Sequence, residues 1–321
     1  MRRPLLIAII CGACSVMLGM GIRQSFGLFL APVSESLGAG RETYSLAMAI
    51  SNIIFGLPLV AMLADRVGAR WVMLGGGLLY ATGLVVMATI TTTLGLYLSI
   101  GLLVGIALSA TTFVTVFGAI GQMVPDASRS RVFGTITSIG SSGMFIIPPL
   151  AQYFISNYGW QQALMVLAGV AGFIMLLAFG LPGKANLQTN ATGGTVTDEP
   201  FLQVLKKAQG HSGYLLLTAG FFVCGFHVAF IATHLPAFLR DQQLPAYIGA
   251  WSLSLIGVFN MIGSYLFGWL GDRFRKKHLL SLLYFARAIV ISLFLFFPVT
   301  QVTALLFLYS HAFLGEVALF L

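Results

Sequence analysis

Two residues that could bind an anion, Arg23 and His227, lie where charge is rare in this sequence. Each falls inside a long apolar run, three residues before a phenylalanine, Phe26 or Phe230. A guanidinium group can hold a carboxylate through two hydrogen bonds, and an imidazole can change its charge near neutral pH. These residues predict a substrate site for an organic anion, in which Arg23 binds the carboxylate and His227 accepts a proton. The alternatives are an arginine that pairs with backbone carbonyls and a histidine that serves packing.

Further ionisable residues also lie inside apolar runs. His234 and Glu316 are candidates for proton coupling, although His234 could instead cap the helix break before Pro236. Arg287 is interpreted as a structural pairing residue. The sequence has no Walker loop, zinc-ligand spacing or nucleophile elbow, so we expect no metal, no cofactor and no enzymatic activity.

The elements that must position these residues are membrane-spanning helices. The sequence is 58% hydrophobic and 8% charged, whereas soluble domains have about 45–50% apolar and about 25% charged residues. Its apolar runs are long enough to cross a hydrocarbon core of about 30 Å, so we predict an all-α membrane protein. The ten predicted spans are 5–31, 44–64, 71–91, 94–123, 132–156, 161–182, 213–238, 247–270, 278–298 and 301–321.

The basic residues give an orientation for these spans. If the N-terminus is cytoplasmic, thirteen lysines and arginines fall on the cytoplasmic side, and only Arg41 and Arg240 fall outside. This asymmetry satisfies the positive-inside rule. The basic residues are scattered over short loops, so the net charge of +8 reports topology and not a nucleic-acid partner.

An internal repeat predicts two related halves. Leu63 to Arg70 recurs as Leu270 to Lys277, which places Asp65 and Asp272 at an offset of 207 residues. The residues Arg23, Phe26 and Pro32 match His227, Phe230 and Pro236 at an offset of 204 residues. We therefore predict an N-terminal bundle at 1–183, a cytoplasmic linker at 184–212 and a C-terminal bundle at 213–321.

The motif Asp65-Arg66-Val67-Gly68-Ala69-Arg70 resembles the loop signature of the major facilitator superfamily. In that family the signature joins helices two and three, and a degraded copy joins helices eight and nine. The resemblance implies a major facilitator fold with a pseudo-repeat of six plus six helices. It also implies that two turns help the bundles to switch conformation, and their residues here are Asp65, Arg66, Gly68, Arg70, Asp272 and Arg273. Projection of the repeat places two more spans beyond 321, so we expect a chain that is truncated at its C-terminus.

The stretch from Gly21 to Phe29, followed by Pro32, resembles the first helix of bacterial carriers related to monocarboxylate and oxalate/formate transporters. The stretch from Cys224 to Pro236 is similar to their seventh helix. These resemblances imply a secondary transporter of the bacterial inner membrane that moves a monocarboxylate by alternating access, with protons as candidate partners and membrane lipid around it. The sequence does not fix the oligomeric state, and we expect a monomer. The alternatives are a drug or metabolite exporter of the same superfamily and an inactive membrane remnant.

Overall fold

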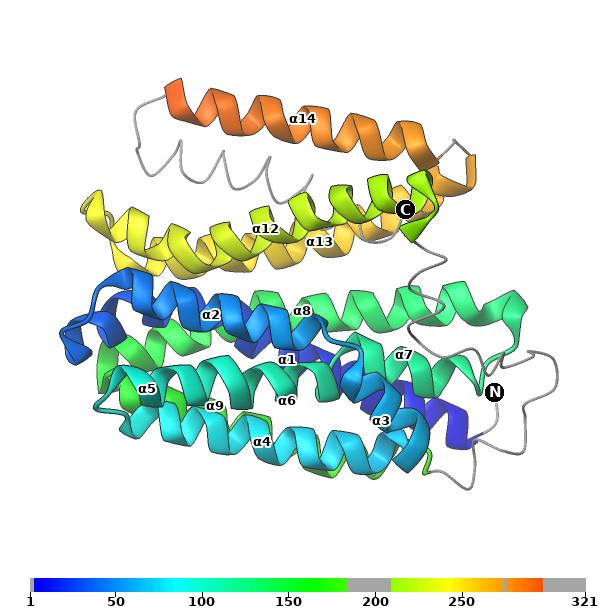
Figure 1. Cartoon of the computed structure of the whole chain (residues 1–321), viewed down its shortest axis with the longest axis horizontal. Helices are drawn as coiled ribbons and strands as arrows, with labels where there is room; N and C mark the ends of the chain where they lie inside the picture. Colours follow the sequence, from blue (N-terminus) through cyan, green and yellow to red (C-terminus); the bar gives the residue numbers. More distant parts are fainter. Residues whose placement is uncertain (1–2, 184–208, 274–275, 297–321) are drawn as a thin grey trace.

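A computed structural model describes residues 3–183, 209–273 and 276–296, and these residues form helices joined by short turns (Figure 1). No strand occurs within these ranges. The first part of the chain comprises α1 (Arg3–Leu37), α2 (Arg41–Gly56), α3 (Leu59–Val67), α4 (Ala69–Thr89), α5 (Thr93–Leu96), the π-helix η1 (Tyr97–Val104), α6 (Gly105–Thr111), α7 (Phe113–Gly121), α8 (Asp126–Tyr158) and α9 (Trp160–Ala178). The second part comprises α12 (Ser212–Asp241), α13 (Ala246–Arg273) and α14 (Lys276–Phe296).

Nine of the ten predicted spans fall on these helices, and the tenth, 301–321, lies outside the described residues. Two spans differ from single α-helices. Span 44–64 is divided into α2 and α3 at Pro58, because proline has no backbone N–H to continue the ladder. Span 94–123 contains the π-helix and an extended residue, Thr112, between α6 and α7. By length and composition alone, six helical segments of the described chain could cross a membrane.

Apolar side chains cover the outside of the bundle as well as its core. The side chains of Trp71, Phe173 and Leu176 are 61%, 52% and 63% exposed. Large exposed apolar residues on successive helices are expected where lipid, and not water, surrounds a protein. The composition and this distribution agree with a multi-pass membrane protein.

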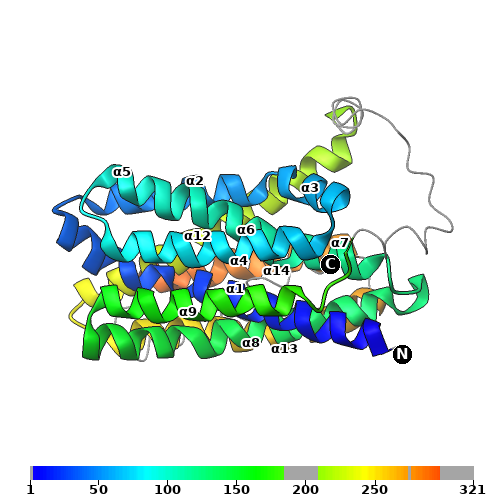
Figure 2. The ribbon, with the colours of Figure 1, turned by 90° about the horizontal axis from the view of Figure 1, so that it is seen from below.

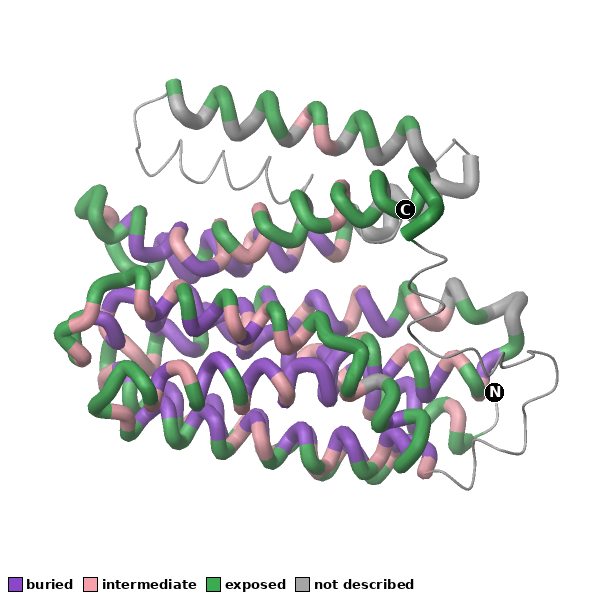
Figure 3. Tube along the Cα trace, viewed as in Figure 1, coloured by how far each residue is buried: buried purple, intermediate pink, exposed green. Residues whose placement is uncertain are grey.

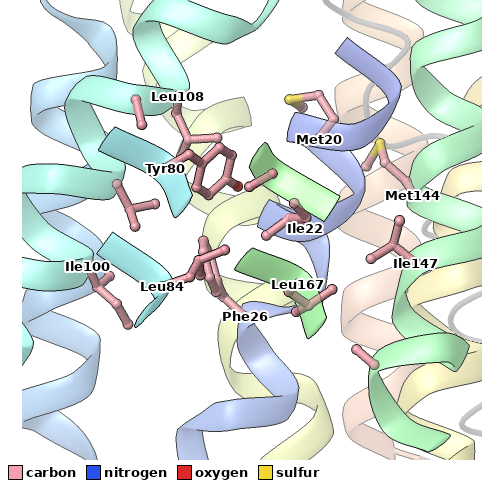
Figure 4. Close-up of a cluster of buried hydrophobic side chains, with 14 of the residues drawn as sticks. Met20, Ile22, Phe26, Tyr80, Leu84, Ile100, Leu108, Met144, Ile147 and Leu167 are labelled. Atoms are coloured by element: carbon pink, nitrogen blue, oxygen red, sulfur yellow. The ribbon is translucent and has the colours of Figure 1, made fainter. Parts of the chain in front are cut away.

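Helix α1 lies at the centre of the first part of the chain, and buried residues occur along most of its length (Figure 3). It packs mainly against α8, and α4 packs against α9. Figure 4 shows Ile22 and Phe26 of α1 between Tyr80 of α4 and Ile147 of α8. Helix α13 packs on α8, and α12 packs on α1, so both helices join the second part of the chain to the first.

The turns after α1 and α12 share one backbone hydrogen-bond pattern at an offset of 205 residues. Gly38 and Gln243, at equivalent places, both have φ of 58°. The donor and acceptor pairs are Gly38 to Glu35, Ala39 to Ser34 and Thr43 to Gly40 in the first turn, and Gln243 to Arg240, Leu244 to Leu239 and Ile248 to Pro245 in the second. This register differs by one residue from the offset of 204 expected for the helices, so it aligns Arg23 with Val228, the neighbour of His227.

The two turns lie at one end of the bundle, on the left in Figure 1. The start of α1 and the turn between α3 and α4 lie at the opposite end, as Figure 2 also shows. Among the residues of α12 whose burial the structure describes, the buried ones lie in the half that approaches its C-terminal turn, namely Thr233, Leu235, Pro236, Ala237 and Leu239. The contacts of α12 with the first part of the chain are therefore concentrated at the end that carries the two turns.

Candidate functional site

Arg23 lies half-buried in the middle of α1 and is held by two residues of α2. Its Nη2 donates a hydrogen bond to Oδ1 of Asn52 at 2.8 Å, and its Cζ lies 5.7 Å from the centre of the Phe55 ring. Asn52 and Phe55 are three residues apart, so they lie on one face of α2. An amide oxygen and an aromatic face both favour a cation, and neither removes its formal charge. The guanidinium is therefore oriented while it remains a cation.

Asn52 and Phe55 are missing from the sequence-based prediction of the site. The signal that could have found Asn52 is the presence of an amide inside a predicted apolar span, where polar side chains usually face a partner. Phe55 has no such signal, because phenylalanine is common throughout these spans. Its role follows only from the position of the ring beside Arg23.

Two buried tyrosines fix the backbone of α1 on either side of Arg23. The hydroxyl of Tyr80 donates to the carbonyl oxygen of Gly19 at 3.1 Å. The hydroxyl of Tyr44 donates to the carbonyl oxygen of Phe26 at 2.7 Å. Both tyrosine side chains are fully buried, so these bonds hold α1 against α4 and α2 in a low-dielectric environment. The helix that carries Arg23 is rigidly placed.

The structure places Phe26 in the core and not on a surface that a substrate could touch. Its side chain is 1% exposed and packs with the buried residues of α1 and α4. The reason is helical geometry, since the centre of a bundle surrounds α1 on nearly every side. In this conformation Phe26 packs in the core, and its contact with a substrate stays a prediction.

Phe230 and His234 belong to a row of rings along α12. The rings of Phe226 and Phe230 stack at 5.9 Å, and the rings of Phe230 and His234 lie 4.7 Å apart. The spacing of four residues puts all three on one helix face. Phe230 is 52% exposed. His227 is half-buried beside this row, with its ring 6.3 Å from that of Phe226.

His234 connects α12 to the start of α2. Its Nε2 lies 3.4 Å from the hydroxyl oxygen of Ser45, which also donates to the carbonyl oxygen of Arg41. Helix α12 continues through Pro236 to Asp241, so there is no helix break before Pro236 for His234 to cap. His234 therefore lies between the two parts of the chain.

The turn that carries the Asp65 motif lies at the end opposite the α1–α2 turn. Gly68 separates α3 from α4 with φ of 104°, a conformation that glycine adopts without strain. Arg70 donates from Nε to the carbonyl oxygen of Leu181 at 3.0 Å, which ties the start of α4 to the segment after α9. Asp65 and Arg66 are exposed on the last turn of α3. The contact of Arg70 is thus made within the first part of the chain.

The second copy of this motif is described only in its backbone. Asp272 and Arg273 form the end of α13, and their side chains lie outside the described residues. Glu316 lies outside them altogether. The predicted roles of these residues remain predictions.

Four charged residues join the two parts of the chain at the end that carries the α1–α2 and α12–α13 turns. We call Glu35, Arg41, Arg240 and Asp241 the four-charge cluster. Arg41 binds the carboxylate of Asp241 through both terminal nitrogens, with Nη2 at 2.7 Å from Oδ1. Arg240 lies with Nη2 at 3.1 Å from Oε1 of Glu35. All four side chains are about half-exposed around an open depression.

Within the ranges that the structure describes, no three histidine, cysteine, aspartate or glutamate residues lie close enough together to hold a metal ion. Among the described site residues, the guanidinium group of Arg23 is the one whose chemistry suits the binding of a small organic anion.

Comparisons with known proteins identify the family of this chain. Residues 9–320 match the Major Facilitator Superfamily. Monocarboxylate transporter 13 of Rattus norvegicus is 28% identical over 298 residues, which are 91% of this chain and 67% of that protein. The bovine protein of the same name is 27% identical over 257 residues, which are 78% of this chain and 58% of that protein. The uncharacterised transporter YcxA of Bacillus subtilis is 26% identical over 270 residues, which are 83% of this chain and 65% of that protein.

The fold is also similar to that of a solved transporter. The nucleoside transporter NupG superposes with a TM-score of 0.71 over 99% of this chain and 81% of that one, at 16% sequence identity. This likeness concerns the fold alone. The predicted resemblance to the superfamily and to monocarboxylate carriers is confirmed by the family match and by the relatives' names. The chain therefore belongs to the Major Facilitator Superfamily, a family of multi-pass membrane transporters and not of enzymes.

Proposed function

We propose that this chain carries the binding site of a secondary transporter for a small monocarboxylate. The observation that carries the proposal is Arg23, a permanent cation in the middle of a spanning helix, oriented by the amide of Asn52 and the ring of Phe55. A guanidinium inside a membrane protein is costly unless it serves a partner or a pathway. The names of the relatives, monocarboxylate transporters 11, 12 and 13, support the same substrate class.

The proposed mechanism is alternating access between a bundle at 1–183 and a bundle at 213–321, joined by a linker at 184–212. Arg23 binds the substrate carboxylate with its two-pronged group, and Phe230 provides an apolar surface for the carbon chain. His227 accepts a proton, so that the loaded site is closer to neutral when it crosses the low-dielectric part of the bundle. The turns at Asp65, Arg66, Gly68 and Arg70, and at Asp272 and Arg273, accompany the change between the two states.

The proposed location is a bacterial inner membrane with the N-terminus in the cytoplasm. Supporting this orientation, the sequence assigns only Arg41 and Arg240 to the outer side. Both are paired with carboxylates in the structure. The two apparent exceptions to the positive-inside rule are therefore neutralised by acids of the other part of the chain.

Substrate binding by the purified, detergent-solubilised chain tests the proposal directly. We would measure the affinity for monocarboxylates of two to four carbons, with the corresponding neutral amides as controls. Arg23→Ala should remove carboxylate binding, and Arg23→Lys should restore little of it, because an ammonium group lacks the planar fork. Arg287→Ala, at the other arginine inside a predicted span, should leave the affinity unchanged. Equal affinities for carboxylates in the chain with and without Arg23→Ala would reject the proposed site.

A further inference from the structure

The span predicted at 94–123 is interrupted inside the bundle, at Thr112. This residue is extended, with φ of −110° and ψ of −156°, and it separates α6 from α7. The extended conformation removes the N–H donors that a continuous helix would provide to the carbonyl oxygens of Ser109, Ala110 and Thr111. These three residues are at most 3% exposed, so bulk water does not reach them. The break therefore leaves three carbonyl oxygens at a buried helix end.

Hydroxyl groups from two helices approach these oxygens. The hydroxyl of Thr115, on α7, donates to the carbonyl oxygen of Ser109 at 3.1 Å. The hydroxyl of Ser15, on α1, donates to the carbonyl oxygen of Thr111 at 3.0 Å. Among the described residues, no side chain donates to the carbonyl oxygen of Ala110, which lies between these two in the chain. Ser15 and Thr115 are 0% and 1% exposed, so the whole group is buried and has no formal charge.

We call the carbonyl oxygens of Ser109, Ala110 and Thr111 and the hydroxyl oxygens of Ser15 and Thr115 the break site, and we propose that it binds a sodium ion. Carbonyl oxygens freed where a span is interrupted are recurrent ligands for Na⁺ in secondary transporters. The break site contains no carboxylate, which sites for Ca²⁺ and Mg²⁺ require, so the ion is monovalent. Oxygens that lie only 3.0 and 3.1 Å apart favour a small ion over K⁺. On binding, each hydroxyl turns its hydrogen away from the carbonyl, and both oxygens face the ion.

The break site is close enough to Arg23 for the two charges to interact. Ser15 and Arg23 are eight residues apart on α1, which corresponds to a rise of about 12 Å. At this distance and an effective dielectric constant of about 20, one unit charge changes the binding of another by about tenfold. Arg23 alone repels the ion, whereas a carboxylate bound to Arg23 cancels the repulsion. If the proposed function holds, substrate and Na⁺ should therefore each raise the other's affinity by about tenfold.

Thermal unfolding of the purified, detergent-solubilised chain measures sodium binding without a substrate. The thermal midpoint is recorded in NaCl, KCl and choline chloride at equal ionic strength. NaCl should raise the midpoint in a saturable manner, because an ion that binds only the folded state stabilises that state. Ser15→Ala and Thr115→Val should each abolish the difference between NaCl and choline chloride, whatever they do to the midpoint in both salts. Thr115→Ser keeps the hydroxyl and should keep the difference.

Ser99→Ala is the matched control. Ser99 is also a buried hydroxyl of this span, but it donates to the carbonyl oxygen of Leu96, away from the break. The variant should therefore keep the sodium-dependent difference in midpoint. A second measurement compares the affinity for monocarboxylates in the same salts. This affinity should be about tenfold higher in NaCl than in choline chloride, and Ser15→Ala should remove the gain.

Two results would overturn the break site. One is an equal midpoint in NaCl and choline chloride, and the other is a sodium-dependent rise that survives both Ser15→Ala and Thr115→Val. A rise of the same size in KCl would reject Na⁺ as the ion. Arg23→Ala should abolish carboxylate binding and preserve or increase the effect of sodium on the midpoint. A sodium effect in a chain that binds no monocarboxylate would reject the anion site alone, so the two proposals can fail separately.

Discussion

The Nη2 of Arg23 and the Oδ1 of Asn52 lie 2.8 Å apart, so an uncharged amide of α2 orients the cation of α1. A carboxylate at the same position would orient Arg23 equally well but would compete with the substrate for its charge. The choice of asparagine is therefore compatible with a site that must still bind an anion.

This relationship predicts that two substitutions of Asn52 weaken binding with different pH dependences. Asn52→Leu should weaken carboxylate binding on the order of tenfold, because a hydrogen bond to a charged group is worth about 1.5–3 kcal/mol. Asn52→Asp should abolish binding at neutral pH and recover it as the pH falls, because protonation removes the competing charge. Titration calorimetry between neutral and acidic pH would measure both. An Asn52→Asp variant that binds as well as the parent at neutral pH would contradict the prediction.

Proton coupling predicts a change in pH dependence at His227. Protonation of an imidazole adds a positive charge, so carboxylate binding should strengthen as the pH falls through the neutral range. His227→Gln should retain binding but lose this slope, since glutamine does not titrate. His211→Gln, at an exposed histidine before α12, is the matched control and should keep the slope. A slope that survives His227→Gln would assign the coupling to another group.

The close approach of α1 and α12 predicts a steric effect at Gly27. Gly27→Ala places a methyl group against the backbone of Ala232, and neither backbone can yield without separating the helices. Overpacking of this kind costs about 1–3 kcal/mol, so the state in which α1 and α12 touch should lose at least about fivefold in population. The rate at which a membrane-impermeant thiol reagent labels Ser45→Cys, at a half-buried position of α2, would measure this loss. Gly172→Ala serves as the control, because its Cβ would meet open space on α9.

The turn at Gly68 predicts a loss of stability that does not involve the substrate. With φ of 104°, an alanine there would be strained by about 1–3 kcal/mol. Gly68→Ala should therefore lower the thermal midpoint of the detergent-solubilised chain. Gly75→Ala, on α4 where a Cβ meets open space, should leave the midpoint unchanged or raise it. Equal midpoints for the two variants would show that the turn does not depend on its glycine.

The sequence predicts much of the fold because lipid imposes a simple rule on it. Each span must be apolar and helical, so apolar runs give the positions of α1, α4 and α12 to within a few residues. The π-helix at Tyr97–Val104 and the break at Thr112 do not follow from hydropathy, since both keep the span apolar. They depend on how neighbouring helices pack.

The candidate site is less predictable than the fold. Arg23 is visible in the sequence because its charge is unusual in an apolar run, but its contact with Asn52 depends on the rotation of α2. The burial of Phe26, in contrast, is not visible in the sequence. A spacing of three residues puts it on the same helix face as Arg23, yet the bundle around α1 buries it. The four-charge cluster is distributed over residues about 200 positions apart, and no local pattern joins them.

The 200-residue separation between Arg41 and Asp241 also has a consequence for biosynthesis. The ribosome completes α2 long before it reaches Asp241, so Arg41 enters the membrane with no carboxylate from α12 to bind. Its pairing has to wait until α12 has been inserted and docked on α1. The Arg41–Asp241 pair can thus form only after α12 is in place, and its presence distinguishes a chain in which α12 has docked on the first helices from one whose first helices have merely been inserted.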